Sequence, residues 1–464
     1  MTPEEKLQLD VRDFWRVYDG IEAYVKLDAE GAMDRLKAHK EDAFCEVTGY
    51  DGKSKLMCTR DGYDAIYSLA ERHRDSMPVP NDYSVKELAD GIQGHFVRAV
   101  VDEKYDELAL ARMLAEAVAD ADKNHIERTY HFPCVVVPYD EPRQFRIGIV
   151  AFTAAKYFRQ AIPTEIQQYV ETSSNQARAT DRVAKFEEYI SQFGWIASVK
   201  IPACAEESAR RRAEVAVTTA INLLRLAFGV DYGHDMRLAH SAYALPRNTE
   251  HALSQNGKLD FVWSRRASGA AVGKDWYLLI DKSQGFLQRA AHLISTTVAG
   301  KRSEAAERVI DALTWFGDAA FESAPGVQMV NFVAALERLT TTEVFRPHNF
   351  CSRVALLALE DDSKFEKTYW DAYAIYAARS GVIHGGFSPS SPTFRNSVRL
   401  AHDVTRNALF RALEVHRLLA GSGKPSDLAG LRNFFASQQS KRAAVLLRLR
   451  KELKKRKQTS PLGI

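Results

Sequence analysis

The stretch KFEKTYWDAYAIYAARSGVIHGG, residues 364–386, has the pattern of a long amphipathic helix that stops at a pair of glycines. Its apolar residues recur every three or four positions and share one helical face: Phe365, Tyr369, Ala372 and Tyr376. The next position on that face is Arg379, so a guanidinium stands where a hydrophobic residue is expected. Burying an unpaired charge costs several kcal/mol, and we therefore expect Arg379 to hold either a carboxylate or a phosphate.

The residues alone leave both partners of Arg379 open. An internal salt bridge would use Glu337 or Glu366, whereas a phosphate would need a second catalytic group, and His384 follows five residues later. On an unbroken helix five residues rotate by about 500°, which leaves the side chains of Arg379 and His384 about 140° apart. The pair can therefore converge on one atom only if the helix is distorted near Gly381 or if a second subunit supplies half of the site.

The spacing of this pair is not specific, because Arg411 and His416 have the same spacing. In RNALFRALEVHRLLA, residues 406–420, the apolar stripe leaves both of them on the flanks of a helix, and we expect them to be surface groups. A basic helical face after the glycines predicts either RNA phosphate contacts or a solvated surface: Arg395, Arg399, His402 and Arg406.

The helix ending and the sequence before it resemble one known family. IYAARSGVIHGG, residues 375–386, is similar to the LYxLRSKxVHGG-like endings of the Apea-like HEPN family. FVAALERL, residues 332–339, resembles the family's helix that ends in Leu-Glu-x-Leu. SRVALLALEDDSKFEKTYWDAYAIY, residues 352–376, resembles the arginine-led helix and spacer before its motif. The resemblance covers residues 300–420, and none is seen for residues 1–282.

The resemblance implies a bundle of about four helices that forms a homodimer, in which two Arg/His motifs line one composite cleft. It also implies an endoribonuclease that needs no metal or other cofactor, with His384 as general base or acid and Arg379 holding the phosphate. The substrate would be RNA, with tRNA and mRNA as candidates, in an anti-phage or toxin-type role. The products would carry a 2′,3′-cyclic phosphate and a 5′-hydroxyl.

Two further residues take supporting roles from the resemblance. Ser380 stands where many HEPN nucleases have Asn, Asp or His, as is usual in the Apea-like branch, and its hydroxyl can donate a hydrogen bond but cannot act as a base. Glu337 matches the family's helix-end glutamate and would either orient Arg379 or serve as a plain salt-bridge partner. The alternative function is a non-catalytic HEPN module that binds RNA, a nucleotide or a partner protein.

The rest of the chain predicts an α+β protein that is predominantly α. We expect a helical lobe over residues 1–128, a mixed α/β region over 129–282, a HEPN-like helical domain over 283–421 and a basic helix or tail over 422–464. A small hairpin or long loop is expected near 46–62. Six runs predict strands of a mixed sheet: TYHFPCVVVP, QFRIGIVAFT, GWIASVKIPA, MRLAHSAYAL, KLDFVWSRR and DWYLLID. One long helix, residues 206–229, accompanies them, and residues 1–282 would sense a phage or regulatory partner.

Composition and charge exclude several protein classes. The 464 residues include 46% apolar residues but no run of about 18 of them, and the first twenty are rich in acids, so we expect a cytoplasmic protein without a membrane partner. The five cysteines are scattered and form no CxxC pair, which argues against disulfides and zinc. Residues 441–457 carry nine basic residues and one acid, and they predict a helix that either follows a phosphate backbone or is simply solvated.

Overall fold

The computed structural model of the chain is mostly helical, with 73% helix and 10% strand, which confirms the predominantly α, α+β class. By internal contacts the chain forms two compact units: Met1–Thr129 with Lys200–Ala213, and Tyr130–Val199 with Glu214–Ile464. The domain boundaries predicted near 128, 282 and 421 stay predictions. The structure describes residues 2–25, 31, 34, 45–49, 55–233, 235–239, 248–255, 258–265, 273–359, 361–421 and 428–459.

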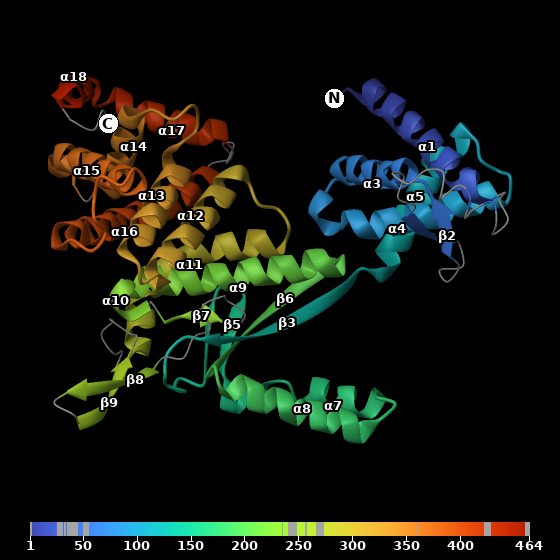
Figure 1. Cartoon of the computed structure of the whole chain (residues 1–464), viewed down its shortest axis with the longest axis horizontal. Helices are drawn as coiled ribbons and strands as arrows, with labels where there is room; N and C mark the ends of the chain where they lie inside the picture. Colours follow the sequence, from blue (N-terminus) through green and yellow to red (C-terminus); the bar gives the residue numbers. More distant parts are fainter. Residues whose placement is uncertain are drawn as a thin grey trace. The chain divides into compact units, whose positions relative to one another are not determined.

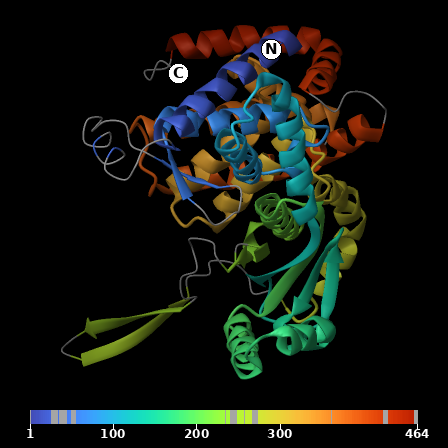
Figure 2. The same ribbon diagram turned by 90° about the vertical axis from the view of Figure 1, so that its right-hand side faces the viewer.

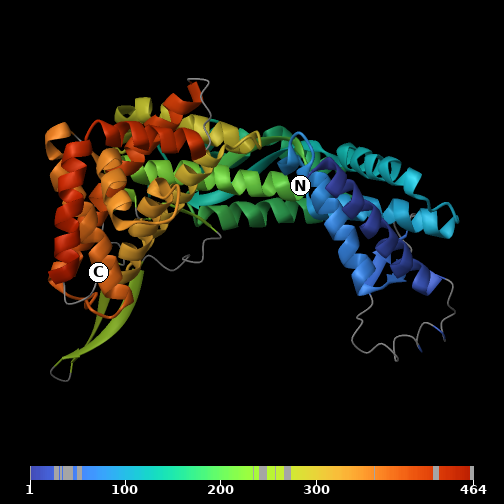
Figure 3. The same cartoon turned by 90° about the horizontal axis from the view of Figure 1, so that it is seen from above.

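The first unit is a helical lobe with one small hairpin (Figures 1 and 3). Ser84 caps helix α4 (Val85–Val101) by accepting a hydrogen bond from the amide of Glu87 at 3.0 Å. The antiparallel strands β1 and β2 confirm the hairpin predicted near 46–62. The elements of this unit are α1 (Pro3–Val25), β1 (Cys45–Thr48), β2 (Lys55–Cys58), α3 (Arg60–Asp75), η1 (Pro80–Asp82), α4 (Val85–Val101) and α5 (Glu107–Asn124).

A five-stranded sheet, most of whose residues belong to the second unit, has the strand order β4-β5-β6-β3-β7. In Figures 1 and 2, helix α9 and the α7–α8 pair lie on opposite sides of this sheet. Its strands are β3 (Ile126–Val135), β4 (Gln144–Ile147), β5 (Val150–Ala154), β6 (Trp195–Cys204) and β7 (Arg237–Leu238). A separate hairpin comprises β8 (Asn248–Gln255) and β9 (Lys258–Arg265). The helices of this region are η2 (Ala155–Tyr157), α6 (Phe158–Ala161), α7 (Pro163–Thr172), α8 (Gln176–Ser191), α9 (Glu206–Phe228) and α10 (Val230–Gly233).

Three predictions for this region were wrong. The sheet is antiparallel rather than mixed, because β4 and β5 are joined by a two-residue turn that only antiparallel strands allow. The long helix α9 ends before Gly229 as predicted, but α7 and α8 add further helices. The run DWYLLID lies at the start of a helix, since Ile280 and Leu287 belong to a buried face that continues at helical spacing.

The remainder of the second unit is a helical bundle around α16, which packs against α11, α12, α13, α14 and α15. Two apolar stripes at helical spacing are buried in its core: Val309, Leu313, Phe316 and Ala320 on α12, and Phe332, Leu336 and Leu339 on α13. The bundle helices are α11 (Tyr277–Val298), α12 (Glu304–Phe321), α13 (Pro325–Thr340), α14 (Pro347–Ala358), η3 (Asp362–Lys364), α15 (Phe365–Ile383), α16 (Pro392–Gly421), α17 (Leu428–Ser440) and α18 (Ala443–Thr459). No helix in the described part of the chain is long and apolar enough to cross a membrane.

Candidate active site

Helix α15 carries Arg379 at the edge of the face that it buries in the bundle. The predicted stripe is largely correct, with Phe365, Tyr369 and Ala372 buried, but the next buried position is Ile375 and Tyr376 is half-buried. Tyr376 stacks on Phe345, with ring centroids 5.5 Å apart. Arg379 is half-buried, and its positive charge acts on Tyr376.

Arg379 has no internal salt bridge among the residues that the structure describes. Its Nε atom is buried without a hydrogen-bond partner. Glu366, one of the two predicted partners, pairs instead with Arg448. Glu337, the other, lies on α13 near enough for the charge of Arg379 to act on it but makes no ion pair with it. Burial raises the pKa of Glu337, and the positive charge of Arg379 opposes that shift.

Helix α15 stays regular up to His384 and then ends sharply. The amide of His384 donates to the carbonyl of Ser380 at 3.0 Å, a normal helical bond, and His384 is the last residue before the turn. Gly385 has φ of +71°, and the amide of Gly386 donates to the carbonyl of Gly381 at 2.6 Å. This is a Schellman ending, which requires a left-handed residue and so favours glycine. The distortion near Gly381 is not found, and the two side chains of one chain point apart.

The residues beside this ending are packed closely. Ser380 is buried, at 8% exposure, on the bundle side of α15. The ring of Phe387 lies over Gly381 so tightly that a Cβ atom there would meet ring carbon Cδ2 at 2.1 Å. His384, by contrast, is exposed to solvent. The structure thus offers an accessible imidazole at His384, where α15 ends, and a half-buried guanidinium at Arg379, five residues earlier in the chain.

The four residues of the predicted basic face divide into two groups. Arg395 and Arg399, near the start of α16, are exposed. His402 turns inward and stacks on Phe316, with ring centroids 5.7 Å apart. Arg406 donates to the carbonyls of Leu226 and Ala227, at 2.9 and 3.0 Å, and so caps the end of α9. Only the first two remain accessible for RNA phosphates.

The rival pair on α16 was predicted to lie on the surface, and this is wrong for its histidine. Arg411 is exposed and forms an ion pair with Glu414 at 2.7 Å. His416 is only 5% exposed and lies beside His292, with ring centroids 5.9 Å apart. Burial, assisted by His292, lowers the pKa of His416 to about 4. Helix α16 is contacted by five neighbouring helices, so its flanks are buried where an isolated amphipathic helix would expose them.

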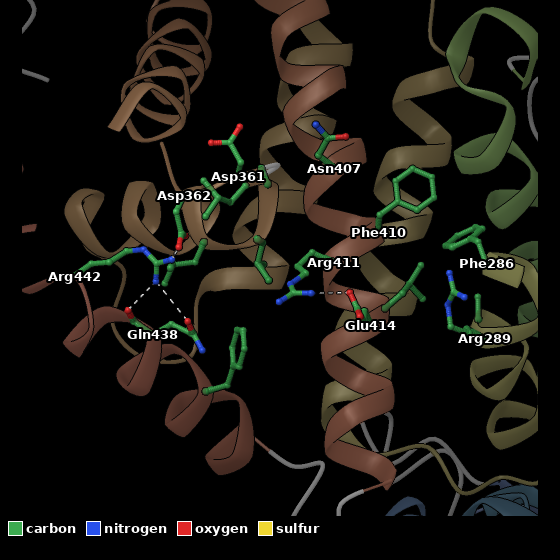
Figure 4. A pocket seen from close by; sticks show the side chains of 17 residues that line it. Phe286, Arg289, Asp361, Asp362, Asn407, Phe410, Arg411, Glu414, Gln438 and Arg442 are labelled. Atoms are coloured by element: carbon green, nitrogen blue, oxygen red, sulfur yellow. Dashed lines mark hydrogen bonds and ion pairs between the residues drawn. The ribbon is translucent and has the colours of Figure 1, made fainter. Parts of the chain in front are cut away.

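A pocket of about 680 Å³ lies between α11, α14, α16 and α17, and none of the predicted site residues lines it (Figure 4). Phe286 and Phe410 form an edge-to-face aromatic pair at one end, with ring centroids 4.6 Å apart. Its charged groups largely pair with one another, Arg411 with Glu414 and Arg442 with Asp362. No local sequence pattern predicts this pocket, because its lining residues come from helices far apart in the chain.

The described residues contain no group of three or more histidine, cysteine or acidic side chains that could hold a metal ion. All five cysteines are free thiols, and all but Cys45 are buried. The functional assignment therefore depends on the geometry of α15 and on the residues around it. No family model, no curated protein and no solved structure matches this chain.

Proposed function

We propose that this chain is a metal-independent endoribonuclease of the HEPN type, with Arg379 and His384 as its catalytic pair. The observation that carries the proposal is the half-buried guanidinium of Arg379, whose Nε has no partner although a carboxylate lies nearby. Such an arrangement costs stability and is retained where function needs the free group. A phosphodiester would supply the anionic oxygens that the fork of an arginine binds best.

The reaction follows from what these two side chains can do. A neutral imidazole of His384 takes the proton of the ribose 2′-hydroxyl, and the 2′-oxygen then attacks phosphorus. The bond from phosphorus to the 5′-oxygen breaks, and a protonated imidazole gives the leaving oxygen its proton. Arg379 stabilises the extra negative charge on the phosphoryl oxygens. The products are a 2′,3′-cyclic phosphate and a 5′-hydroxyl.

A second copy of the chain would complete this site. The regular helix keeps Arg379 and His384 of one copy about 140° apart, so the two must meet across a dimer. Exposed apolar side chains near the end of α15 would be covered by such a partner. Three of them are 45–48% exposed: Val327, Ile383 and Phe387. Val327 belongs with the other two because the start of α13 lies beside the end of α15, where a Cβ atom at Gly326 would meet Val382 at 3.4 Å.

The supporting residues take definite places in this proposal. Burial raises the pKa of Glu337 and the nearby positive charge of Arg379 opposes that shift, so we assign Glu337 the orientation of Arg379. Ser380 is buried against the bundle and would fix the last turn of α15 rather than touch RNA. Arg395 and Arg399 would contact flanking phosphates.

The biological role that fits best is defence against phage or a toxin-type role, with tRNA or mRNA as substrate. The support is the resemblance of residues 300–420 to that group of HEPN proteins. An RNase in its own host needs restraint, and residues 1–282 would supply it by sensing a phage or regulatory partner.

The test is RNA cleavage by the purified full chain in excess EDTA. We expect cleavage by wild-type protein and none by the separate Arg379→Ala and His384→Ala variants. Mixing the two variants should restore up to about a quarter of the wild-type rate, because half of the dimers are mixed and each has one intact site. If the His384→Ala protein alone cleaves as fast as wild type, the proposal fails.

A second candidate function is a non-catalytic module that binds a nucleotide in the pocket of Figure 4. The pocket's volume of about 680 Å³ lies within the range of small-molecule sites, and it combines aromatic rings with arginine side chains. Calorimetric titration of ATP into wild-type and Arg289→Ala proteins would test it. Heat of binding that Arg289→Ala removes, in a protein that cleaves no RNA, would favour this function.

A further inference from the structure

We infer that helix α18 is a docking surface for the sugar–phosphate backbone of single-stranded RNA, which it leads toward Arg379 and His384. The direction of the RNA rests on the proposed function, but binding by α18 can be measured without cleavage. The inference has three supports, which are the two faces of α18, its direction along α15 and the partners of its charged side chains.

Helix α18 has one apolar and one basic face. Leu446, Leu449 and Leu453 are 7%, 0% and 4% exposed and hold the helix against the bundle. The opposite side is exposed and carries the cations: Arg448, Arg450, Lys451, Lys454 and Lys455. The stretch 441–457 contains a single acid, Glu452, so its field is strongly positive.

The partners of α18 show that it runs in the same direction as α15. Residues that increase along α18 meet residues that increase from η3 into α15: Arg442 pairs with Asp362, Arg448 pairs with Glu366, and the charge of Glu452 acts on Tyr369. Helix α15 ends at the Arg379 and His384 motif, and α16 begins just beyond it with Arg395 and Arg399 exposed. Helix α18 therefore runs, with its basic face, toward the end of the bundle where these four residues lie.

The spacing along the helices fits a short single strand. From Tyr369 to Arg379 the axis of α15 advances by about 15 Å, and from Glu452 to Lys454 that of α18 advances by about 3 Å. Along the common helix direction, Lys454 therefore lies about 12 Å before the level of Arg379, a gap that a few nucleotides cross. A strand lying on α18 would reach the site without a bend in the protein.

The cations at the start of α18 form ion pairs with the bundle, whereas several cations further along the described part of the helix do not. Arg442 and Arg448 are engaged by carboxylates of η3 and α15 and anchor the helix. Arg450, Lys451 and Lys454 are exposed and have no carboxylate partner among the described residues. Three free cations within about one turn of helix attract a polyanion, and each phosphate they neutralise releases counterions.

The buried apolar face favours RNA over a membrane. A basic amphipathic helix binds an anionic bilayer by inserting its apolar face. In α18 that face is occupied by the bundle, and in the described part of the helix the large exposed apolar residues are Val445 and Leu447, at 36% and 57% exposure. The exposed side of α18 therefore presents mainly charge and no continuous apolar face, and charge suits a nucleic-acid backbone.

The experiment measures RNA binding by the full chain carrying His384→Ala, so that the RNA stays intact. A fluorescent 20-nucleotide single-stranded RNA is titrated at several salt concentrations, with and without Arg450→Gln, Lys451→Gln and Lys454→Gln together. We expect the slope of log affinity against log salt to fall by about 2, and the affinity to fall about tenfold. The matched control removes three exposed cations elsewhere in the same unit, as Lys274→Gln, Lys282→Gln and Lys301→Gln, and should change neither quantity.

Each outcome bears on one claim. Unchanged affinity and salt slope in the α18 variant would overturn the inference, whatever the cleavage assay shows. Equal loss in the control variant would also overturn it, because only net charge would then matter. Tighter binding of wild-type protein to anionic phospholipid vesicles than to RNA would assign α18 to a membrane instead. If α18 binds RNA but wild-type protein cleaves none, the inference stands and the proposed nuclease fails.

Discussion

Two Arg/His pairs with the same spacing lie in opposite environments of one helical bundle. At the end of α15, Arg379 is half-buried with its Nε unpartnered, and His384 is exposed. Within α16, Arg411 is exposed and paired with Glu414, and His416 is 5% exposed. The pattern of exposure is inverted between the two pairs. Spacing on a helix therefore says nothing about chemistry until the packing around the helix is known.

The difference comes from where each pair lies along its helix. Helix α15 ends one residue before His384, and Gly385 turns the chain away, so this imidazole is left in solvent. His416 lies near the middle of the second half of α16, under neighbouring helices, and its pKa falls to about 4. A histidine that resists protonation at neutral pH cannot serve as an acid. Of the two pairs, only the one on α15 leaves its imidazole exposed to solvent, as the proposed reaction requires.

The largest expected effect is on RNA cleavage, which should depend on the pair at the end of α15 and not on the pair within α16. His384→Ala should lower kcat by a factor of roughly 10² to 10⁴, the usual contribution of a general acid or base. His416→Phe and Arg411→Ala should leave kcat within about twofold, because neither touches the proposed site. Single-turnover cleavage of labelled RNA measures all three.

The control is the folded state of each variant, followed by circular dichroism during thermal unfolding. His384→Ala should unfold as wild type does, since its side chain is exposed. A loss of activity in His416→Phe equal to that in His384→Ala would erase the distinction drawn between the two pairs.

The second effect is the contribution of His416 to the dependence of stability on pH. Its pKa of about 4 lies below the ordinary value of 6.5, so the folded protein binds this proton less readily than the unfolded chain. The stabilisation is complete above pH 6.5 and is lost as the pH falls toward 4, by about 3 kcal/mol. Urea unfolding at pH 7 and pH 4 should show a loss of stability that is larger in wild type than in His416→Phe by this amount.

His384→Phe is the matched control, because it removes one histidine from the exposed pair. It should keep the acid sensitivity of wild type. Other histidines with lowered pKa, such as His131 and His348, contribute equally to all three proteins and cancel in the comparison. An identical pH dependence in wild type and His416→Phe would contradict the burial of His416 as its cause.

The third effect tests the helix ending that distinguishes α15 from α16. In Gly381→Ala the new Cβ would meet the ring of Phe387, whereas the equivalent position after Arg411 is Leu413 inside a continuous helix. We expect a loss of about 1–2 kcal/mol, since the ring must leave its place. In a Phe387→Ala background the same change should instead stabilise by up to about 1 kcal/mol through helix propensity. Urea unfolding of the four proteins forms a double-mutant cycle, and additive effects would show that the ring does not rest on Gly381.

Much of the bundle was readable from the sequence, and the environment of the site was not. Apolar periodicity predicted most of the stripe that α15 buries, and the glycine pair predicted the end of that helix, because both are local patterns. The fate of Arg406 and His416 depended on which helices cover α16, and that is set by contacts between distant segments. The sequence left open whether Arg379 has a carboxylate partner. Only the positions of Glu337 and Glu366 in the structure show that neither carboxylate forms an ion pair with it.

The smallest effect concerns what the free guanidinium costs the folded protein. Arg379→Met keeps the length of the side chain and removes a half-buried group whose Nε has no partner. We expect the free energy of unfolding to rise by up to about 1 kcal/mol, because no ion pair is broken. Arg411→Met should change it by no more than about 0.5 kcal/mol in the destabilising direction, since it breaks an exposed pair at i,i+3 spacing.

Urea unfolding at pH 7 measures both changes, and the sign of the first one matters most. The pKa of Glu337 should rise further in Arg379→Met, because the positive charge that opposes the effect of burial is gone. A destabilisation of more than about 1 kcal/mol would mean that Arg379 already has an internal partner in the folded chain. Arg379 would then be a structural residue like Arg406, and the phosphate that it is proposed to hold would lose its site.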